Sequence, residues 1–408
     1  MNILFVHEAD LLNKVVFEIH NLAEILSKNH EVFAIDYEES WKKKNVFDLG
    51  TLRTQEFKNV SRAYKGKGFT LRRPGMIKIP VLSRLSAFFT HNREIENIIK
   101  NEKIDAIILY SAPTNGLQTI YLAKKYNIPV IFRSIDILNQ LVPNWFLRAP
   151  TRIFEKKVYE NADRIVAITP MLSDYVINLG ASKDKVELLF TGVDTNQFNP
   201  EIDPTKLRNE LDLSNDCKVI VFIGTLFEFC GMDRYIEQFP EILKEFPETK
   251  LIVVGGGFLH EKLKKLVKDL KLEDSVILTG FQPYEMMPQY LNLADICINP
   301  FQINDTTRDI MPGKILQYLA CGKPVIATPL AGMKAVIPDE ERGVVYSEID
   351  EFGMSTIELL RDEERITTEQ IESTIELTHK AGIQSVGYFM HRMEGLIGNF
   401  ISGDFRCL

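Results

Sequence analysis

The chain lacks the features that mark membrane-spanning, disulfide-linked and metal-binding proteins. No apolar run approaches the roughly eighteen residues needed to cross a bilayer. The five cysteines are odd in number and have no paired spacing, so we interpret them as reduced, packed thiols of a cytoplasmic protein. The histidines show no metal-ligand spacing and no two aspartates stand two positions apart, so no metal is expected.

The first ten residues, MNILFVHEAD, also lack a basic stretch ahead of their short apolar run, so we expect a strand there and not a signal peptide. At 408 residues the chain is long enough for two domains, each with its own core.

Charge is distributed unevenly along the chain. The net charge is −8, yet residues 1–200 hold 27 basic and 22 acidic residues. Within 52–93 ten basic residues, including Arg72, Arg73 and Lys78, stand against Glu56 alone, with aromatic residues between them. Such a segment is typical of a protein surface that binds an anionic membrane. The alternative is a solvated loop and helix that cover the core. Nucleic acid is not expected, because no recognition motif accompanies the charge.

Short apolar segments alternate with helical patterns along almost the whole chain. We expect strands at 3–6, 32–35, 106–110, 130–133, 164–168 and 186–190, then at 219–223, 251–254, 276–278, 296–299 and 325–327. Strands that are apolar on both faces and separated by helices form parallel sheets. The sequence therefore predicts an α/β protein of two Rossmann-like, doubly wound parallel-sheet domains facing a cleft. Their ligands would bind at the carboxyl ends of the strands.

The stretch 192–204, rich in Gly, Asp, Asn and Pro, is interpreted as a linker. It separates an N-terminal domain at 1–191 from a C-terminal domain at 205–380.

The most informative stretch is MPGKILQYLACGKPVIATP at 311–329. It predicts a Pro-Gly turn, a short amphipathic helix and a buried strand. Pro312 presets the first helical turn, and Gly313 allows close approach of another group. Helix starts offer free N–H groups to anions, and Lys314 adds a positive charge. Because a cation at a helix start opposes the helix dipole, we expect a bound anion there.

This stretch resembles the C-terminal-domain motif of family 4 glycosyltransferases, whose helix start binds a nucleotide-sugar donor. Segments at 162–169, 192–194, 221–226, 251–257 and 280–281 match the family in the same order. The resemblance implies a GT-B fold and a last helix at about 383–401, within 381–408, that crosses back to the N-terminal domain. It also implies that the donor is bound by Gly224, Thr225, Gly255, Phe281, Arg308, Gly313, Lys314, Ile315 and Gln317.

The chain departs from the family pattern at several positions. Thr225 and Cys230 stand where the family usually places two cations on its phosphate loop, so Lys314 and Arg308 are expected to compensate. In the N-terminal domain, Asn13 and Lys14 replace a Gly-Gly turn.

The family's two glutamates, eight positions apart, correspond here to Asp309 and Gln317. By resemblance, Asp309 would contact donor-sugar hydroxyls or stabilise positive charge on the sugar; a helix cap is the alternative. Gln317 would accept from a ribose hydroxyl, or be an exposed helix residue. Asp136 follows a strand where the family has a catalytic histidine nearby, so it is expected to orient the acceptor, act as a base, or cap the next segment.

The resemblance implies a retaining glycosyltransferase that moves a sugar from a nucleotide-diphosphate donor to a glycan or lipid-linked acceptor. Its expected place is the cytoplasm, either free or peripheral on the cytoplasmic membrane face, and its expected role is in cell-surface polysaccharide or glycoconjugate synthesis. No cofactor besides the substrate is expected. The alternatives are a non-catalytic partner subunit and a nucleotide-sugar epimerase on the same fold.

Overall fold

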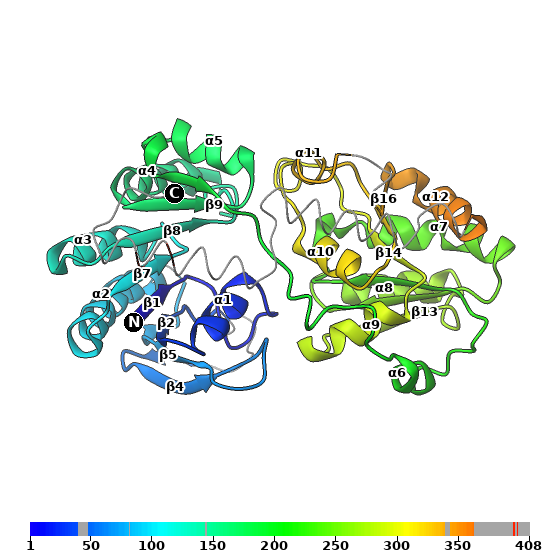
Figure 1. Ribbon diagram of the computed structural model, residues 1–408, viewed down its shortest axis with the longest axis horizontal. Coiled ribbons are helices and arrows are strands. Elements are labelled where there is room, and N and C mark those ends of the chain that lie inside the picture. Colours follow the sequence, from blue (N-terminus) through cyan, green and yellow to red (C-terminus); the bar gives the residue numbers. More distant parts are fainter. Residues whose placement is uncertain are drawn as a thin grey trace. The chain divides into compact units, whose positions relative to one another are not determined.

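The computed structural model describes residues 1–39, 48–80, 82–142, 145–338 and 343–362, and the isolated glycines 395 and 398. The chain divides into two compact units between Phe190 and Thr191 (Figure 1), and each unit is described on its own. Of the helix expected at about 383–401 the structure describes only Gly395 and Gly398, so that helix, like the domain and linker bounds, stays a prediction.

Unit 1 is built on an eight-stranded sheet with the order β10-β9-β8-β7-β1-β2-β5-β4. All neighbouring pairs are parallel except β4 and β5. The strands are β1 (Asn2–Val6), β2 (Glu31–Ile35), β4 (Gln55–Val60), β5 (Phe69–Arg73), β7 (Ala106–Leu109), β8 (Val130–Ser134), β9 (Arg164–Ala167) and β10 (Val186–Leu188). Two short strands, β3 (Gly50–Thr51) and β6 (Met76–Ile77), form a separate antiparallel pair.

Helices cover both faces of this sheet. They are α1 (Glu18–Leu26), α2 (Leu82–Glu102), α3 (Gly116–Tyr126), α4 (Trp145–Asn161), α5 (Pro170–Asn178) and the 3-10 turn η2 (Lys183–Lys185). The connection through α1 adds β2 on one side of β1, and the connections through α2 to α5 add β7, β8, β9 and β10 in turn on the other side. Because crossovers are right-handed, α1 lies on one face and α2 on the other, as Figure 1 shows.

The centre of unit 1 is apolar, as the sequence predicts. Every residue of β7 and β8 is buried, and their side chains join α2, α3 and α4 in one core cluster. Burying a large apolar side chain stabilises the fold by roughly 1.5–3 kcal/mol, so this cluster holds sheet and helices together.

Unit 2 repeats the plan with a six-stranded, wholly parallel sheet in the order β13-β12-β11-β14-β15-β16. Its strands are β11 (Val219–Ile223), β12 (Lys250–Val254), β13 (Val276–Gly280), β14 (Ile296–Asn299), β15 (Val325–Ala327) and β16 (Val344–Tyr346). The longer helices are α6 (Thr205–Glu210), α7 (Met232–Glu245), α8 (His260–Asp269), α9 (Met287–Leu293), α10 (Gly313–Ala320), α11 (Ala331–Lys334) and α12 (Phe352–Arg361). Short 3-10 turns are η3 (Glu228–Cys230), η4 (Tyr284–Met286) and η5 (Ile349–Glu351).

Each sheet reverses its direction of growth once. In unit 1 the reversal falls between β1 and β7, and in unit 2 between β11 and β14. At such a point the two crossover connections leave on opposite faces, and the carboxyl ends of the strands between them stay uncovered. Both predicted doubly wound sheets are therefore confirmed.

The basic segment at 52–93 contains β4, β5 and the first half of α2. The two strands were not predicted from the sequence. The segment's expected role as a membrane surface is wrong for Arg73. This side chain is 5% exposed, lies 2.7 Å from Asp10 Oδ1 and donates to both carboxylate oxygens of Asp36. Although burial opposes the charge, the bonds to Asp36 and the attraction of both carboxylates raise the pKa of Arg73.

The other two expected surface cations are also neutralised within unit 1. Arg72 forms ion pairs with Glu56, Glu94 and Glu102 at 2.9–3.3 Å. Lys78 lies between Glu38 and Asp48, at 3.1 and 2.7 Å. Except for Glu56, the acidic partners lie outside 52–93 or at its far end, and these three side chains do not form a free positive surface.

We predict that Arg73→Ala destabilises the protein by about 3–5 kcal/mol, because it leaves two buried carboxylates without their counter-ion. Urea unfolding followed by circular dichroism measures the change. The control is Arg53→Ala, at an exposed position of the same segment, with an expected change of at most about 0.5 kcal/mol. A similarly small change for Arg73→Ala would show that the carboxylates do not depend on it.

Candidate active site

Three glycine turns at the carboxyl edge of unit 2 are joined by backbone hydrogen bonds. Gly224, after β11, donates to Val254 O, and Gly255, after β12, donates to Gly280 O, both at 2.9 Å. A Cβ on Gly255 would lie 1.9 Å from Gly224 O, and the φ of Gly255 is +146°. Glycine at 255 is thus required for the two turns to pack, whatever the ligand.

Lys314 reaches from the first turn of α10 into the Gly224 turn. Its Nζ lies 4.0 Å from the ring centre of Phe222 and 4.5 Å from that of Phe301. A Cβ on Gly224 would be 2.6 Å from Nζ, so only glycine leaves room for the ammonium group. Two aromatic rings and a glycine turn therefore hold this cation at the reversal point of the sheet.

The ammonium group of Lys314 has aromatic neighbours but no anionic one. Among the described residues, none forms a hydrogen bond or ion pair with Nζ. Desolvation in this apolar setting lowers the pKa of Lys314 to about 7. Next to it, a Cβ on Gly313 would meet no atom within 4 Å, so the space over the helix start is open. The arrangement suits a bound anion, which would supply the missing counter-charge.

The two positions where the family has loop cations carry none here. Thr225 is half-buried and Cys230 is fully buried, with its thiol pKa raised by burial. On the opposite side of the turns, Phe281 is 58% exposed and its ring covers Gly256. An exposed ring at this edge offers a stacking surface for a planar group.

The two charged side chains before α10, Arg308 and Asp309, differ in whether a described residue binds them. Arg308 is exposed and forms a surface ion pair with Asp305 at 3.3 Å, so its charge is partly neutralised. Asp309 is half-buried, and no described residue bonds to its carboxylate. The helix cap is Pro312, so the interpretation of Asp309 as a cap is wrong.

Within α10, two predicted donor residues have internal partners. Ile315 is fully buried and its N–H donates to Pro312 O at 3.0 Å, which removes it from the candidate site. Gln317 is half-buried, not exposed, and its Nε2 donates to Tyr284 Oη at 3.0 Å. This bond fixes the amide and leaves its Oε1 as an acceptor.

Two buried polar side chains at the same edge were missed. Asn299 ends β14 and Thr328 follows β15; neither amide atom of Asn299 nor the hydroxyl of Thr328 has a partner among the described residues. Buried polar atoms normally have partners, so these atoms are candidates for ligand contact. A polar residue directly after an apolar strand was the signal that the sequence offered.

At the carboxyl edge of unit 1, a buried ion pair ties three elements together. Arg133 of β8 is fully buried and donates to both oxygens of Glu18 on α1, at 2.7 and 3.0 Å. It also donates to Leu189 O, and Tyr110 donates to the same Glu18. Arg133 is therefore a structural residue that positions the start of α1.

Asp136 lies in the connection between β8 and α4. Burial, assisted by the negative charge of Glu18, raises the pKa of Asp136 to about 6. None of the described residues bonds to its carboxylate, and α4 begins nine residues later, so the capping interpretation fails. A carboxyl group with this pKa is suited to accept a proton near neutral pH.

Unpartnered polar atoms surround the reversal point of unit 1 and were also missed. They are His7 Nδ1 after β1, Ser111 Oγ after β7, Asn115 Nδ2 at the start of α3 and Ser134 Oγ at the end of β8. Desolvation, with Lys14 nearby, lowers the pKa of His7 to about 3, so its ring is neutral. A cluster of neutral donors and acceptors suits hydroxyl groups, such as those of a sugar.

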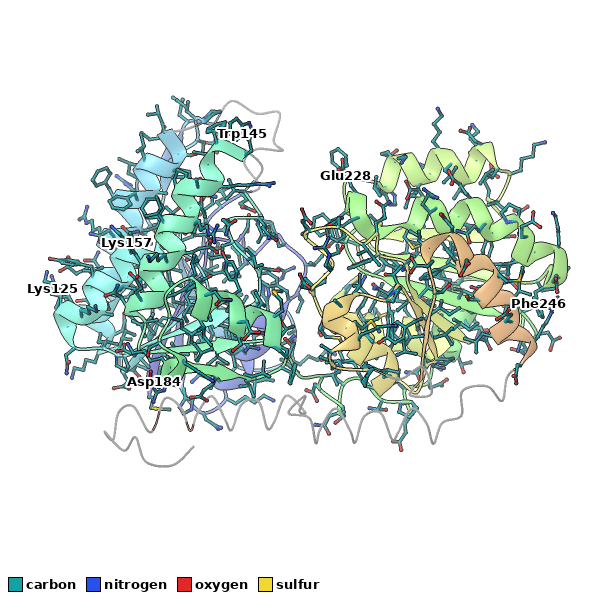
Figure 2. The ribbon with its side chains drawn as sticks, turned by 90° about the horizontal axis from the view of Figure 1, so that it is seen from above. Lys125, Trp145, Lys157, Asp184, Glu228 and Phe246 are labelled. Atoms are coloured by element: carbon teal, nitrogen blue, oxygen red, sulfur yellow. The ribbon has the colours of Figure 1, made fainter. Side chains whose placement is uncertain are left out.

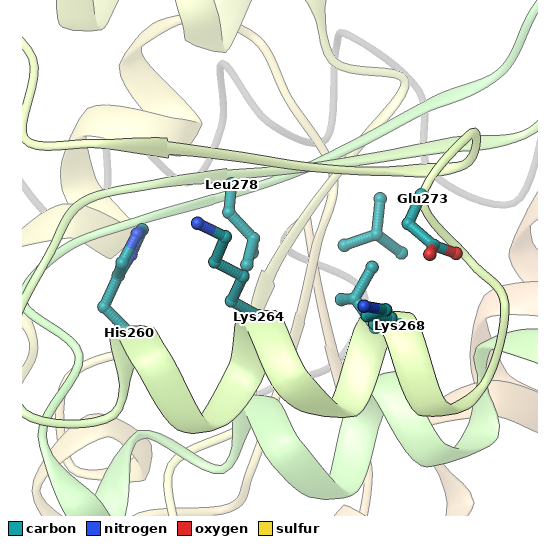
Figure 3. Close-up of a pocket in the computed structure, with 7 residues that line it drawn as sticks. His260, Lys264, Lys268, Glu273 and Leu278 are labelled. Carbon is teal, nitrogen blue, oxygen red and sulfur yellow. The ribbon is translucent and has the colours of Figure 1, made fainter.

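A groove of about 310 Å³ lies apart from these polar groups, along α8 and the edge strand β13 (Figure 3). Lys264 and Lys268 of α8 reach toward Leu278 and Glu273 across it. Lysines over an exposed sheet edge are a common protection against strand pairing, so we assign no ligand to the groove.

The part of the chain that the structure describes contains no group of three or more His, Cys, Asp or Glu that could hold a metal ion. Nor does any helix in that part have the length and apolarity to span a bilayer.

Family models match most of the chain. "Glycosyltransferase Family 4" matches residues 19–197 and "Glycosyl transferases group 1" matches residues 217–362. The matched ranges include the site residues described above at the carboxyl edges of both sheets, from Tyr110 to Ser134 in unit 1 and from Gly224 to Thr328 in unit 2. The chain belongs to the family 4 (group 1) glycosyltransferases, as its sequence motifs predict.

Two relatives indicate how far the likeness extends. The chain is 27% identical over 226 residues to the GDP-mannose-dependent alpha-(1-6)-phosphatidylinositol monomannoside mannosyltransferase of Mycolicibacterium smegmatis, over 54% of this chain and 59% of that protein. It is 24% identical over 323 residues to the alpha-monoglucosyldiacylglycerol synthase of Streptococcus pneumoniae, over 75% of this chain and 70% of the other.

The fold also matches solved structures. One is Anabaena HepE in complex with UDP-glucose, with a TM-score of 0.72, 16% identity and coverage of 98% of this chain and all of that one. The predicted GT-B class, with two Rossmann-like units, is confirmed.

We predict that Asp136→Asn stabilises the protein more at pH 8 than at pH 4. A carboxyl whose pKa is raised from 3.8 to about 6 on folding costs stability as the pH rises through that interval, and the cost remains above it. The asparagine removes that cost. Thermal unfolding of both proteins at the two pH values measures it.

Asp163→Asn, on a neighbouring loop of unit 1, serves as the control, because the Asp163 carboxylate accepts from Val130 N and should be needed at pH 8. Equal shifts for Asp136→Asn at both pH values would mean that Asp136 is not destabilised by burial.

Proposed function

We propose that this protein is a retaining glycosyltransferase that moves a sugar from a nucleoside-diphosphate donor on unit 2 to a hydroxyl group of an acceptor on unit 1. The observation that carries the proposal is Lys314, a cation at the reversal point of the unit 2 sheet that has no anionic partner among the described residues. The reaction class, transfer of a glycosyl group, comes from the family to which the chain belongs.

In this proposal the diphosphate lies over Gly224 and the start of α10. Lys314 and the free N–H groups of the first helical turn would neutralise its charge in place of the missing loop cations. As the bond between the sugar carbon and the diphosphate oxygen breaks, the negative charge on that oxygen grows and these groups stabilise it further. Phe281 would stack on the base, and Asn299 and Thr328 would donate to phosphate or sugar oxygens.

Asp309 would act on the sugar. Its carboxylate has no bond to a described residue, so it remains available for a sugar hydroxyl or for the positive charge that develops on the ring. The acceptor oxygen would form the new bond to the sugar carbon, and Asp136, with a pKa of about 6, would take the proton that this oxygen loses.

For the acceptor we propose a lipid-linked glycan or glycolipid. The names of both relatives above contain a lipid, phosphatidylinositol monomannoside in one and diacylglycerol in the other. The neutral polar cluster of His7, Ser111, Asn115 and Ser134 would bind its sugar hydroxyls. Such an enzyme would work at the cytoplasmic membrane face in cell-surface glycoconjugate synthesis.

The absence of cations at Thr225 and Cys230 keeps a second candidate, a non-catalytic partner subunit, open to test. It predicts donor binding without any turnover, whereas an epimerase predicts conversion of the donor with no acceptor present. Incubation of the protein with a panel of labelled nucleotide sugars, with and without lipid extract, distinguishes the three. Proton NMR of the product then shows whether the anomeric configuration is retained.

We predict that Lys314→Ala weakens binding of a nucleoside diphosphate by roughly 1.5–3 kcal/mol, the usual size of a charged hydrogen bond. Titration calorimetry with UDP and GDP measures it. Because the pKa of the free lysine is about 7, wild-type affinity should also fall as the pH rises from 7 to 9.

The matched control is Lys264→Ala, an exposed lysine of the same unit that lines the α8 groove. Its affinity should equal that of the wild type. If the two variants bind the nucleotide equally well, Lys314 does not contact the diphosphate; if only Lys264→Ala loses affinity, the groove is the donor site.

We predict that Asp309→Asn lowers kcat by at least about a hundredfold and changes the Kd of the nucleoside diphosphate by less than about threefold. The difference arises because its proposed contact is to the sugar in the transition state. Asp305→Asn, at an exposed position of the same loop, is the control. Equal losses in turnover and affinity would assign Asp309 to the structure of the loop.

A further inference from the structure

The first turns of α4 expose apolar side chains at an unusual density. All six residues from Trp145 to Pro150 are exposed. Trp145 is 79% exposed, Phe146 59% and Leu147 44%, and the rings of the first two meet edge to face at 6.3 Å. Figure 2 shows Trp145 at the start of the helix, on the periphery of its unit. We call Trp145, Phe146 and Leu147 the α4 tip.

A basic stripe runs along the same helix. Arg148, Arg152 and Lys156 are exposed and stand four residues apart, so they share one flank of α4. Beside them, Phe146, Ile153 and Lys157 share the outward stripe. The outward side of α4 is therefore apolar at its start and basic farther along, where Figure 2 labels Lys157.

The charges of the stripe are mostly not neutralised. Lys156 lies 3.7 Å from Glu160, and Arg148 donates to Val142 O. Among the described residues, no carboxylate forms an ion pair with Arg148, Arg152 or Lys157. This differs from the basic segment at 52–93, where Arg72, Arg73 and Lys78 have internal acidic partners.

A second exposed apolar group lies two helices away on the same face of the sheet. On α2, Leu85 is 56% exposed, Phe88 45% and Phe89 71%. Helix α3, which packs against both α2 and α4, exposes Tyr121 between them. Crossover helices run antiparallel to their strands, so both α2 and α4 begin at the carboxyl edge of the sheet, where Asp136 lies.

We propose that the tip and basic stripe of α4, with the exposed side chains at the start of α2, dock on an anionic bilayer. Apolar aromatic side chains entering the interface beside arginines and lysines that reach the headgroups are the features of a helix lying in a membrane surface. A symmetric pair of chains would bring two basic stripes together, which disfavours a second copy as the occupant.

The docking needs no glycosyltransferase activity, but its purpose rests on the proposed function. Asp136 and the α4 tip are nine residues apart along the chain, on either side of the connection from β8 into α4, and both belong to the carboxyl edge of the sheet. A lipid-linked acceptor would thus present its hydroxyl to unit 1 while its chains stay in the bilayer.

The test uses the full-length protein and vesicles of phosphatidylcholine, alone or with about one third phosphatidylglycerol. Wild type should sediment with the anionic vesicles at low salt, less at high salt, and weakly with phosphatidylcholine alone. Trp145→Ser with Phe146→Ser should weaken binding by about a hundredfold, because each buried aromatic contributes roughly tenfold. Arg152→Glu with Lys156→Glu should weaken it by at least about 25-fold, or roughly fivefold per charge removed.

Two matched controls separate this surface from charge or exposed side chains in general. Lys264→Glu with Lys268→Glu reverses two exposed lysines on α8 in the other unit, and Met354→Ser removes an exposed apolar side chain of α12. Both should bind vesicles like the wild type. Binding reduced equally by the α8 pair would overturn the proposal in favour of general electrostatic attraction.

The depth of insertion has its own probe. The chain has two tryptophans, Trp41 and Trp145, so Trp41→Phe leaves only the tryptophan of the tip. Its fluorescence should shift to the blue with anionic vesicles and be quenched by brominated lipid chains. Neither effect, or a shift that depends on protein concentration in the absence of vesicles, would overturn the proposal and indicate self-association.

Calorimetry with UDP and GDP is run on every variant. Unchanged nucleotide affinity with lost vesicle binding supports the docking surface. If no variant, including the wild type, binds a nucleotide, the proposed function fails while the vesicle result still decides the docking.

Discussion

The site in unit 2 depends on one cation held without a counter-ion. Lys314 Nζ lies between two aromatic rings and against a turn that only glycine can form at 224. Backbone bonds from Gly224 N to Val254 O and from Leu226 N to Gly256 O hold that turn, and α10 supplies the lysine from its first turn. Removing a charge from water is costly unless a partner replaces the water, so a bound anion would stabilise the protonated form of this lysine. An anionic donor fits this constraint.

The two units solve a common problem with different chemistry. Each uncovers the carboxyl ends of two strands where its sheet reverses direction. Unit 2 places a cation, a half-buried carboxylate and open helix N–H groups there, which suit a charged ligand. Unit 1 places neutral polar atoms and Asp136 there, and satisfies its strongest charges internally through the pairs of Arg133 and Arg73. The same fold thus has a cationic carboxyl edge in one unit, and in the other an edge of neutral polar atoms with one carboxyl group.

The local sequence predicted the strands and the start of α10 well, because their causes are local. Apolar runs such as 219–223 and 325–327 form buried parallel strands wherever helices can cover them, and Pro312 and Gly313 start a helix in any context. The basic segment failed for the opposite reason. The partners of Arg72, Arg73 and Lys78 lie tens of residues away, and no local pattern shows which carboxylate the chain will bring to them.

The sequence by itself determined the two alternating α/β halves, the family and the presence of Lys314 at a helix start, since these follow from residue order over short spans. Only the tertiary structure decided that Lys314 faces Gly224, that Ile315 is core, and that Arg72, Arg73 and Lys78 are paired internally while Arg148 and Arg152 of α4 are exposed. Whether a charge is exposed, paired or enclosed depends on contacts between strands and helices distant in sequence. Those contacts are set by the packing of each sheet, which no single segment contains.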